Sequence, residues 1–147
     1  MTNHNVDALN DVTKTLIDSQ KGYEKVCEMS DDSHALRNKF QTLAAERADL
    51  IQSFQTQVRT YGAEPATSGG VGGSLHRAWA DFTSLFQDDE KAALEAVEDG
   101  EEYLAKQVAS KLDSKDIDLP TRELLERAQA SALHGERFAD MTEKARF

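Results

Sequence analysis

The sequence predicts an all-α protein, a four-helix bundle in which one long connection carries a short extra helix. Five segments of the 147-residue chain, four long and one short, repeat apolar side chains at the spacing of an amphipathic helix, and no stretch has the pattern of a strand. The chain contains two prolines, and its eight glycines are clustered, which favours long uninterrupted helices. The length suits a single domain, residues 1–147, with a core of its own.

The first two helices are predicted as a hairpin over residues 6–29 and 31–61. Ser30 is a good cap for the second helix, because its hydroxyl can accept a hydrogen bond from the free amides of the first turn. At the far end, Gly62 can adopt the left-handed conformation that ends helices, and Pro65 prevents continuation. Almost no residues separate the two helices, so they should run antiparallel. The apolar face of the first helix consists of Val6, Leu9, Thr13, Leu16, Tyr23 and Cys27.

A long connection, residues 62–87, follows the hairpin and carries a short helix at about 74–86. Its first part, GAEPATSGGVGGSL, has glycines but lacks the Gly-Lys-Ser/Thr motif of a phosphate-binding loop, so we expect a plain linker. In the short helix, Trp79 should pack on the bundle with Leu75 and Phe82, since an exposed aromatic stripe would favour aggregation. One long crossover of this kind is the topology of ferritin-like folds.

The remaining two helices are predicted over residues 88–112 and 119–146. Asp88 can cap the first of them, because aspartate is a preferred N-cap residue. Pro120 stands in the first turn of the last helix, where proline is tolerated. Together with the hairpin, these segments complete the four long helices of the bundle.

Composition and charge narrow the partners and the cellular location. The net charge of −10 disfavours nucleic acid and anionic membranes, because both repel an acidic surface. No apolar run approaches the length of a membrane span, and the N-terminus lacks the apolar core of a signal peptide. Cys27 is the only cysteine, so nothing calls for an oxidising compartment. We therefore expect a cytoplasmic protein with no nucleic acid or membrane partner.

One polar residue lies near the centre of the apolar face of each long helix. At about 100° per residue, these are Gln20, Arg47, Glu101 and His134, each near the middle of its helix. The middles of antiparallel helices lie at one level of a bundle, so the four side chains should meet in a central polar layer. An interior arginine needs a partner, and Glu101 is the carboxylate whose helical phase points most directly at Arg47.

This central layer has a structural and a functional interpretation. As a satisfied network it fixes the register of the helices, which is the usual role of polar groups in a core. As a site, its carboxylates and imidazole could hold a metal ion, because these groups are common ligands of zinc and iron. Glu46 and Glu98 lie further round their helices and could supplement such a site.

Several stretches spread over nearly the whole chain carry a resemblance to a known family. They are DSQKGYEKV (18–26), LAAERADLI (43–51), SLHRAW (74–79), EDGEEYL (98–104) and the late His134. These stretches look like an uncharacterised bacterial family of ferritin-like four-helix-bundle proteins that is catalogued as a domain of unknown function. The resemblance implies the fold and no particular activity.

The wider ferritin-like superfamily implies a di-iron carboxylate site, which needs a glutamate from each of two helices and Glu-x-x-His from the other two. No Glu-x-x-His occurs in this sequence, and Arg47 would place a positive charge beside the cations. A complete di-iron site is therefore not expected. A single divalent ion, iron or zinc, held by Glu46, Glu98 or Glu101 with His134 stays open as an alternative.

Three functions follow from these patterns. The first is a non-enzymatic ferritin-like bundle with a polar network in its core, a candidate stress or binding protein. The second is a metal-binding protein with a degenerate carboxylate and histidine site. The third is an interaction module that forms a homodimer through an apolar surface. An enzyme is less favoured, because serine, histidine and aspartate form no nucleophilic motif and His76 has no visible partner.

Overall fold

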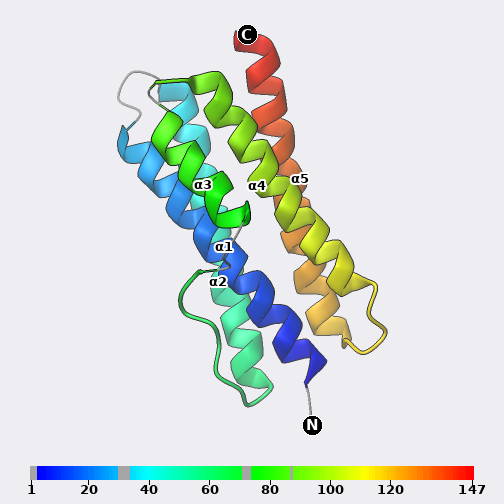
Figure 1. Cartoon of the computed structure of the whole chain (residues 1–147). Coiled ribbons are helices and arrows are strands. Elements are labelled where there is room, and N and C mark those ends of the chain that lie inside the picture. Colours follow the sequence, from blue (N-terminus) through cyan, green and yellow to red (C-terminus); the bar gives the residue numbers. More distant parts are fainter. Residues whose placement is uncertain (1–2, 30–33, 71–73, 87) are drawn as a thin grey trace.

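The computed structural model describes residues 3–29, 34–70, 74–86 and 88–147, and these residues form five α-helices and no strand. The prediction of an all-α protein is therefore confirmed. In chain order the helices are α1 (His4–Met29), α2 (His34–Thr60), α3 (Ser74–Leu85), α4 (Glu90–Leu112) and α5 (Leu119–Arg146) (Figure 1).

The predicted helix caps have different outcomes. Ser30, the predicted cap of the second helix, lies outside the described residues. The side chains of Leu75 and His76 in the short helix also lie outside them. α4 is capped by Asp89 rather than by Asp88, and the Asp89 side chain accepts a hydrogen bond from the amide of Ala92 at 3.0 Å. The Asp88 amide instead bonds back to the last turn of α3, so this residue belongs to the turn between the helices.

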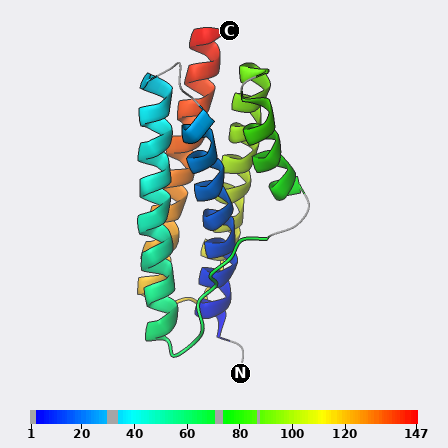
Figure 2. The same ribbon diagram turned by 90° about the vertical axis from the view of Figure 1, so that its left-hand side faces the viewer.

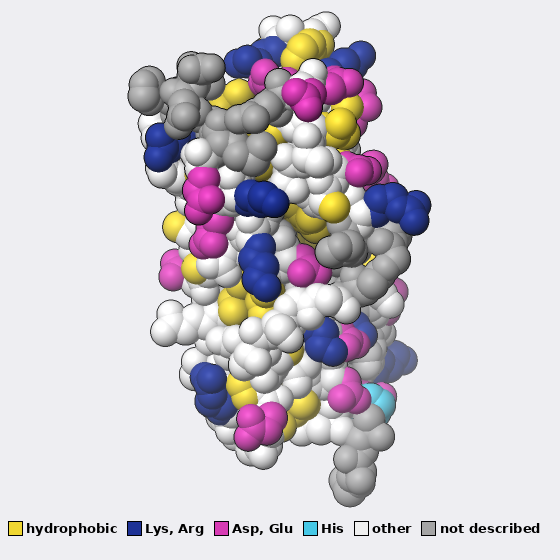
Figure 3. Space-filling view, turned by 60° about the vertical axis from the view of Figure 1, so that its left-hand side comes forward, with side chains coloured by type: hydrophobic (Ala, Val, Ile, Leu, Met, Phe, Trp, Pro, Cys, Tyr) yellow, Lys and Arg dark blue, Asp and Glu magenta, His cyan; other side chains and the backbone are white. Residues whose placement is uncertain are grey.

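The four long helices lie side by side, and the short helix α3 covers part of their surface (Figures 1 and 2). α1 packs along α2, α4 packs along α5, and α2 also contacts α5, while α3 lies against α1 and α4. Every helix formed by the described residues is too short or too polar to span a membrane. On the face shown in Figure 3, hydrophobic side chains appear in small groups between charged ones.

The glycine-rich connection after α2 is fastened to α1 over its described part (Figure 2). Asn10 of α1 donates to the carbonyl oxygen of Glu64 at 3.1 Å and accepts from the amide of Ala66 at 2.9 Å. Further along, the amide of Gly70 donates to Asp18 Oδ2 at 3.3 Å. The predicted plain linker therefore follows a defined path along α1, which its sequence does not indicate.

Two groups of buried apolar side chains form the core, one in each half of the long helices. The first is rich in aromatic residues, whose ring centroids are 5.2–6.1 Å apart; it includes Tyr23, Phe40, Trp79, Phe82 and Phe86. The second is mainly aliphatic; it includes Leu9, Leu16, Leu50, Leu104 and Leu125. The boundary between the two groups falls near the middle of each long helix. The buried polar side chains of Ser19, Arg47, Glu101 and Ser131 occupy that boundary.

Two glycines make room for Trp79, which is only 4% exposed and so packs on the long helices as predicted. A Cβ atom at Gly22 of α1 would lie 2.8 Å from a carbon of the tryptophan ring. A Cβ atom at Gly100 of α4 would lie equally close to a different carbon of the ring, at 2.8 Å. Contacts this short do not occur in packed proteins, so the missing side chains allow the indole to enter between α1 and α4.

We expect Gly100→Ala to destabilise the protein even though alanine is the better helix former. The substitution gains about 1 kcal/mol of helix propensity, but overpacking against the indole costs about 1–3 kcal/mol. Urea denaturation followed by circular dichroism would measure the difference. Ala109→Gly, at an exposed position of the same helix, is the control and should lose about 1 kcal/mol through propensity alone. A more stable Gly100→Ala variant would contradict this packing of Trp79.

Candidate functional site

A bidentate ion pair between Arg47 of α2 and Glu101 of α4 lies at the boundary between the two core groups. Both side chains are fully buried. Arg47 Nη1 donates to Glu101 Oε1 at 2.8 Å, and Arg47 Nη2 donates to Glu101 Oε2. Paired charge-assisted bonds of this kind are stronger than neutral hydrogen bonds, and here they engage both oxygens of the carboxylate.

Two serines complete the surroundings of the guanidinium. Arg47 Nη1 also donates to Ser19 Oγ of α1 at 3.0 Å, and Arg47 Nε donates to Ser131 Oγ of α5 at 2.9 Å. Nη2 donates in addition to the backbone oxygen of Ser131 at 3.1 Å. A guanidinium has five N–H donors, and five hydrogen bonds are formed. The buried charge is therefore fully satisfied, and all four long helices take part.

Tyr23 of α1 and Gly135 of α5 close the site around the carboxylate. A Cβ atom at Gly135 would stand 1.7 Å from Glu101 Oε2 and 3.1 Å from Tyr23 Oη, so the glycine leaves room for both groups. The Arg47 guanidinium lies over the Tyr23 ring, with Cζ 5.7 Å from the ring centroid. Burial, and then the charge of Glu101, raise the pKa of Tyr23 well above its ordinary value, so the phenol stays protonated.

The structure brings Arg47 and Glu101 together, but other residues stand where Gln20 and His134 were expected. Gln20 is half-buried, and its amide donates to Glu24 of the same helix at 2.9 Å. The His134 side chain is 42% exposed. The serines one residue before Gln20 and three residues before His134 reach the guanidinium instead. α1 is in contact with α2, α3 and α4, so a wide face of this helix is buried. The centre of the buried face therefore differs from the centre of the apolar face that the sequence indicates.

A chain of polar contacts leads from the buried pair to the surface. Ser131 Oγ donates to Glu46 of α2, and His134 Nδ1 lies 3.8 Å from Glu46 Oε2. On its other side, His134 Nε2 lies 2.7 Å from Lys39 Nζ. An ammonium group can only donate, so Nε2 accepts and the ring proton of the neutral imidazole is on Nδ1, facing Glu46. Glu46 and His134 therefore lie together at the outer end of this chain.

The four residues predicted as metal ligands lie in three separate places. Glu101 is held within the buried pair, whereas Glu46 and His134 lie near the surface. Glu98 is about 60° round α4 from Glu101, and acidic residues of α5 are its neighbours. In the part of the chain that the structure describes, no three His, Cys, Asp or Glu side chains are grouped as metal ligands.

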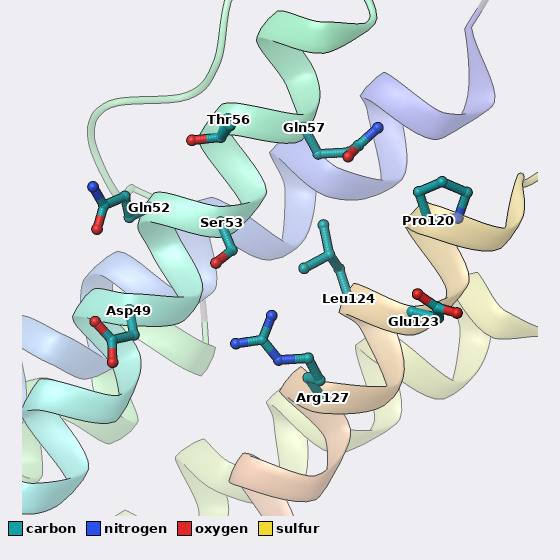
Figure 4. Close-up of a pocket in the computed structure, with 9 residues that line it drawn as sticks. All are labelled: Asp49, Gln52, Ser53, Thr56, Gln57, Pro120, Glu123, Leu124 and Arg127. Atoms are coloured by element: carbon teal, nitrogen blue, oxygen red, sulfur yellow. The ribbon is translucent and has the colours of Figure 1, made fainter.

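A groove between α2 and α5 lies over the outer end of the polar chain. It consists of two adjoining hollows of about 580 Å³ and 370 Å³, which share Asp49 of α2 and Arg127 of α5. Figure 4 shows the larger hollow. The lining of the smaller hollow includes Glu46, Ser131 and His134. Sequence reasoning missed this groove, because helical periodicity indicates which residues face a core but not how closely two neighbouring helices approach.

Comparison with known proteins places the greater part of the chain in a family. The model of a family described as a domain of unknown function (DUF2383) matches residues 4–114. The matched range includes Arg47 and Glu101 and ends before α5, the helix that carries Ser131. No curated protein and no solved structure matches the chain.

Substitutions at Ser19 and Gln20 should separate the observed site from the predicted layer. Ser19→Ala removes an acceptor from the buried guanidinium and should cost about 1.5–3 kcal/mol of unfolding free energy. Gln20→Ala, one residue along the same helix, should change it by less than about 0.5 kcal/mol. Chemical denaturation of both variants measures the two values. The reverse order of the two effects would show that α1 is rotated relative to this structure.

The protein should also lose stability as the pH rises through neutrality because of Glu98. Burial, followed by the charges of Glu143 and Asp140, raises the pKa of Glu98 from 4.5 to about 7. A group whose pKa is raised by folding stabilises the protein fully below the unfolded pKa, and this contribution is lost as the pH rises through the folded pKa. The Glu98→Gln variant, which stays neutral, should therefore gain in melting temperature relative to the native protein between about pH 5 and pH 8.

The control for this comparison is Glu126→Gln, which changes an exposed glutamate of α5. Its melting temperature should follow that of the native protein across the same pH range. If the Glu98→Gln and native curves also run parallel, Glu98 does not have the surroundings described above.

Proposed function

We propose that this chain, which belongs to the DUF2383 family of domains of unknown function, is a non-enzymatic ferritin-like four-helix bundle that has a closed interior and acts by binding at its surface. The observation that carries the proposal is the complete use of the Arg47 donors inside the protein. Both oxygens of Glu101 are engaged by the same guanidinium. The side chains of the protein therefore fill the polar layer between the helices.

The ferritin-like part of the proposal is supported by the arrangement of the helices. Four long helices lie side by side, and the connection between α2 and α3 is much longer than the turn between α4 and α5 (Figure 1). Folds of the ferritin-like class combine four such helices with a single long crossover and bind their metal ions between the helices. Here the Arg47 guanidinium stands between the helices, and its fixed positive charge disfavours a cation at the same level.

The non-enzymatic part of the proposal is supported by the state of the buried polar groups. A general base needs a free acceptor within reach of a substrate proton, and the oxygens of Glu101 already accept from Arg47. Ser131 Oγ accepts a hydrogen bond from Arg47 and donates one to Glu46. Tyr23 is fully buried as a protonated phenol. The side chains of Arg47, Glu101 and Ser131 bind one another and are buried, so they offer no free reactive atom to solvent.

A second candidate function is the binding of one divalent ion, iron or zinc, at Glu46 and His134. The observation that favours it is the 3.8 Å separation between His134 Nδ1 and Glu46 Oε2 at the edge of the groove. An ion bound there would replace the proton on Nδ1, so the imidazole would carry its proton on Nε2 and lose the hydrogen bond from Lys39. Imidazole and carboxylate are common zinc ligands, and two protein ligands with water can give a weak site. Such an ion would lie outside the buried pair, so this candidate does not require the interior to open.

Paired substitutions at Arg47 and Glu101 test the closed interior. Glu101→Ala leaves the guanidinium uncompensated and should cost about 3–5 kcal/mol of unfolding free energy. Replacing both residues together, Arg47→Met with Glu101→Leu, should cost far less, because apolar side chains of similar size need no partners. Urea denaturation of the three proteins gives the comparison. A double variant as unstable as Glu101→Ala would refute the structural role of the pair.

Metal content of the same preparations, purified without chelator, distinguishes the two candidates. The closed interior predicts no stoichiometric iron or zinc in the native protein or in the double variant. Stoichiometric metal that is lost in His134→Ala would favour the second candidate. Metal that is lost in Glu101→Ala but kept in His134→Ala would place a cation in the interior and overturn the main proposal.

A further inference from the structure

The groove between α2 and α5 has opposite charges on its two walls that do not pair with each other. Asp49 stands on α2 and Arg127 on α5, and both line both hollows of the groove. Neither side chain has a hydrogen bond or an ion pair with any residue that the structure describes. In Figure 4 the guanidinium of Arg127 extends from α5 into the space between the helices, beside Ser53 and Leu124.

The remaining lining of the groove is partly apolar. Leu50 and Leu124 lie in its lining. Only 3% and 8% of their surfaces are exposed, and these exposed parts form a small apolar floor at the bottom of the groove. Ser53 and Gln57 add neutral hydrogen-bonding groups on the α2 side. Volumes of about 580 Å³ and 370 Å³ are of the size that accommodates a small molecule. A ligand here would meet two unpaired charges and an apolar surface.

We propose that this groove binds a small zwitterion of the α-amino acid class, with its carboxylate on Arg127 and its ammonium group on Asp49. A bidentate carboxylate is the ligand that best matches a guanidinium, and an ammonium group has three donors for a carboxylate. The proposal rests on the proposed surface role of the protein and names its ligand. It uses no atom of the buried pair.

The charges of the groove select a zwitterion over an ion of one sign. Glu46, Asp49 and Glu123 line the groove together with Arg127, and the whole chain carries a net charge of −10. This negative field opposes a simple anion, whatever its contact with the arginine. A simple cation gains from the carboxylates but leaves the Arg127 guanidinium without a counter-charge. Only a ligand with both charges gains from both walls.

The test uses L-leucine, whose side chain suits the apolar floor, and two analogues that each lack one charged group. These are 4-methylpentanoate, which lacks the ammonium group, and 3-methylbutylamine, which lacks the carboxylate. Each is titrated into the ¹⁵N-labelled full chain, and amide shifts of Ser53 and Gln57 are followed. We expect saturable binding of L-leucine and affinities at least roughly tenfold weaker for both analogues, since each loses a charge-assisted contact.

Single substitutions then test whether the charged residue on each wall of the groove contacts the ligand. Arg127→Gln and Asp49→Asn should each weaken L-leucine binding at least roughly tenfold. Both side chains are exposed and unpaired, so the variants should keep the native helicity. Arg59→Gln is the matched control, because Arg59 is an exposed arginine of α2 that lies outside the groove lining, and it should leave the affinity unchanged.

Three outcomes would overturn the proposal. They are the absence of saturable shifts, an analogue that binds as tightly as L-leucine, and an unchanged affinity in Arg127→Gln. None of these outcomes depends on the buried pair, whose test is the comparison of unfolding free energies and metal content. A failure at the groove is therefore distinguishable from a failure of the closed interior.

Discussion

The burial of the Arg47 guanidinium is the constraint on which the rest of the structure depends. A charged group that leaves water without partners costs several kcal/mol, which is a large part of the total stability of a typical domain. α4 supplies the carboxylate of Glu101, and α1 and α5 supply the hydroxyls of Ser19 and Ser131. Because these partners come from three helices, a shift of any one helix along its axis would leave part of the charge unsatisfied. The pair therefore fixes the register of all four long helices.

The charged members of the site could be derived from the sequence, whereas the neutral members could not. Arg47 and Glu101 interrupt apolar faces, and a charge at such a position is conspicuous in a helical periodicity. Ser19 is not conspicuous, because serine is compatible with a core, a surface and a cap. Gln20 matched the spacing of its apolar neighbours better than Ser19 did, but that spacing does not include the extra packing of α3 and α4 against α1. His134 lies outside the buried pair for a related reason, since it is at the edge of the buried face of α5.

The helices themselves follow from periodicity, but their closest contacts depend on atoms that are absent. Gly22, Gly100 and Gly135 lie inside helices, where a pattern of apolar and polar residues treats glycine only as a weak helix former. The structure shows that the first two accept the ring of Trp79 and that the third accepts the carboxylate of Glu101. These roles can be recognised only when the partner from another helix is in place. The same limit applies to the groove, whose width depends on the spacing between α2 and α5.

The distribution of the buried site over the chain has a consequence for the order in which the protein assembles. Ser19 and Arg47 belong to the α1–α2 half, and Glu101 and Ser131 belong to the α4–α5 half. Neither half contains both a charge and its counter-charge, so neither can exclude water at that level by itself. The interior becomes dry only when the two halves meet. We therefore expect the burial of this level and the formation of the ion pair to occur together, which favours cooperative folding of the two halves.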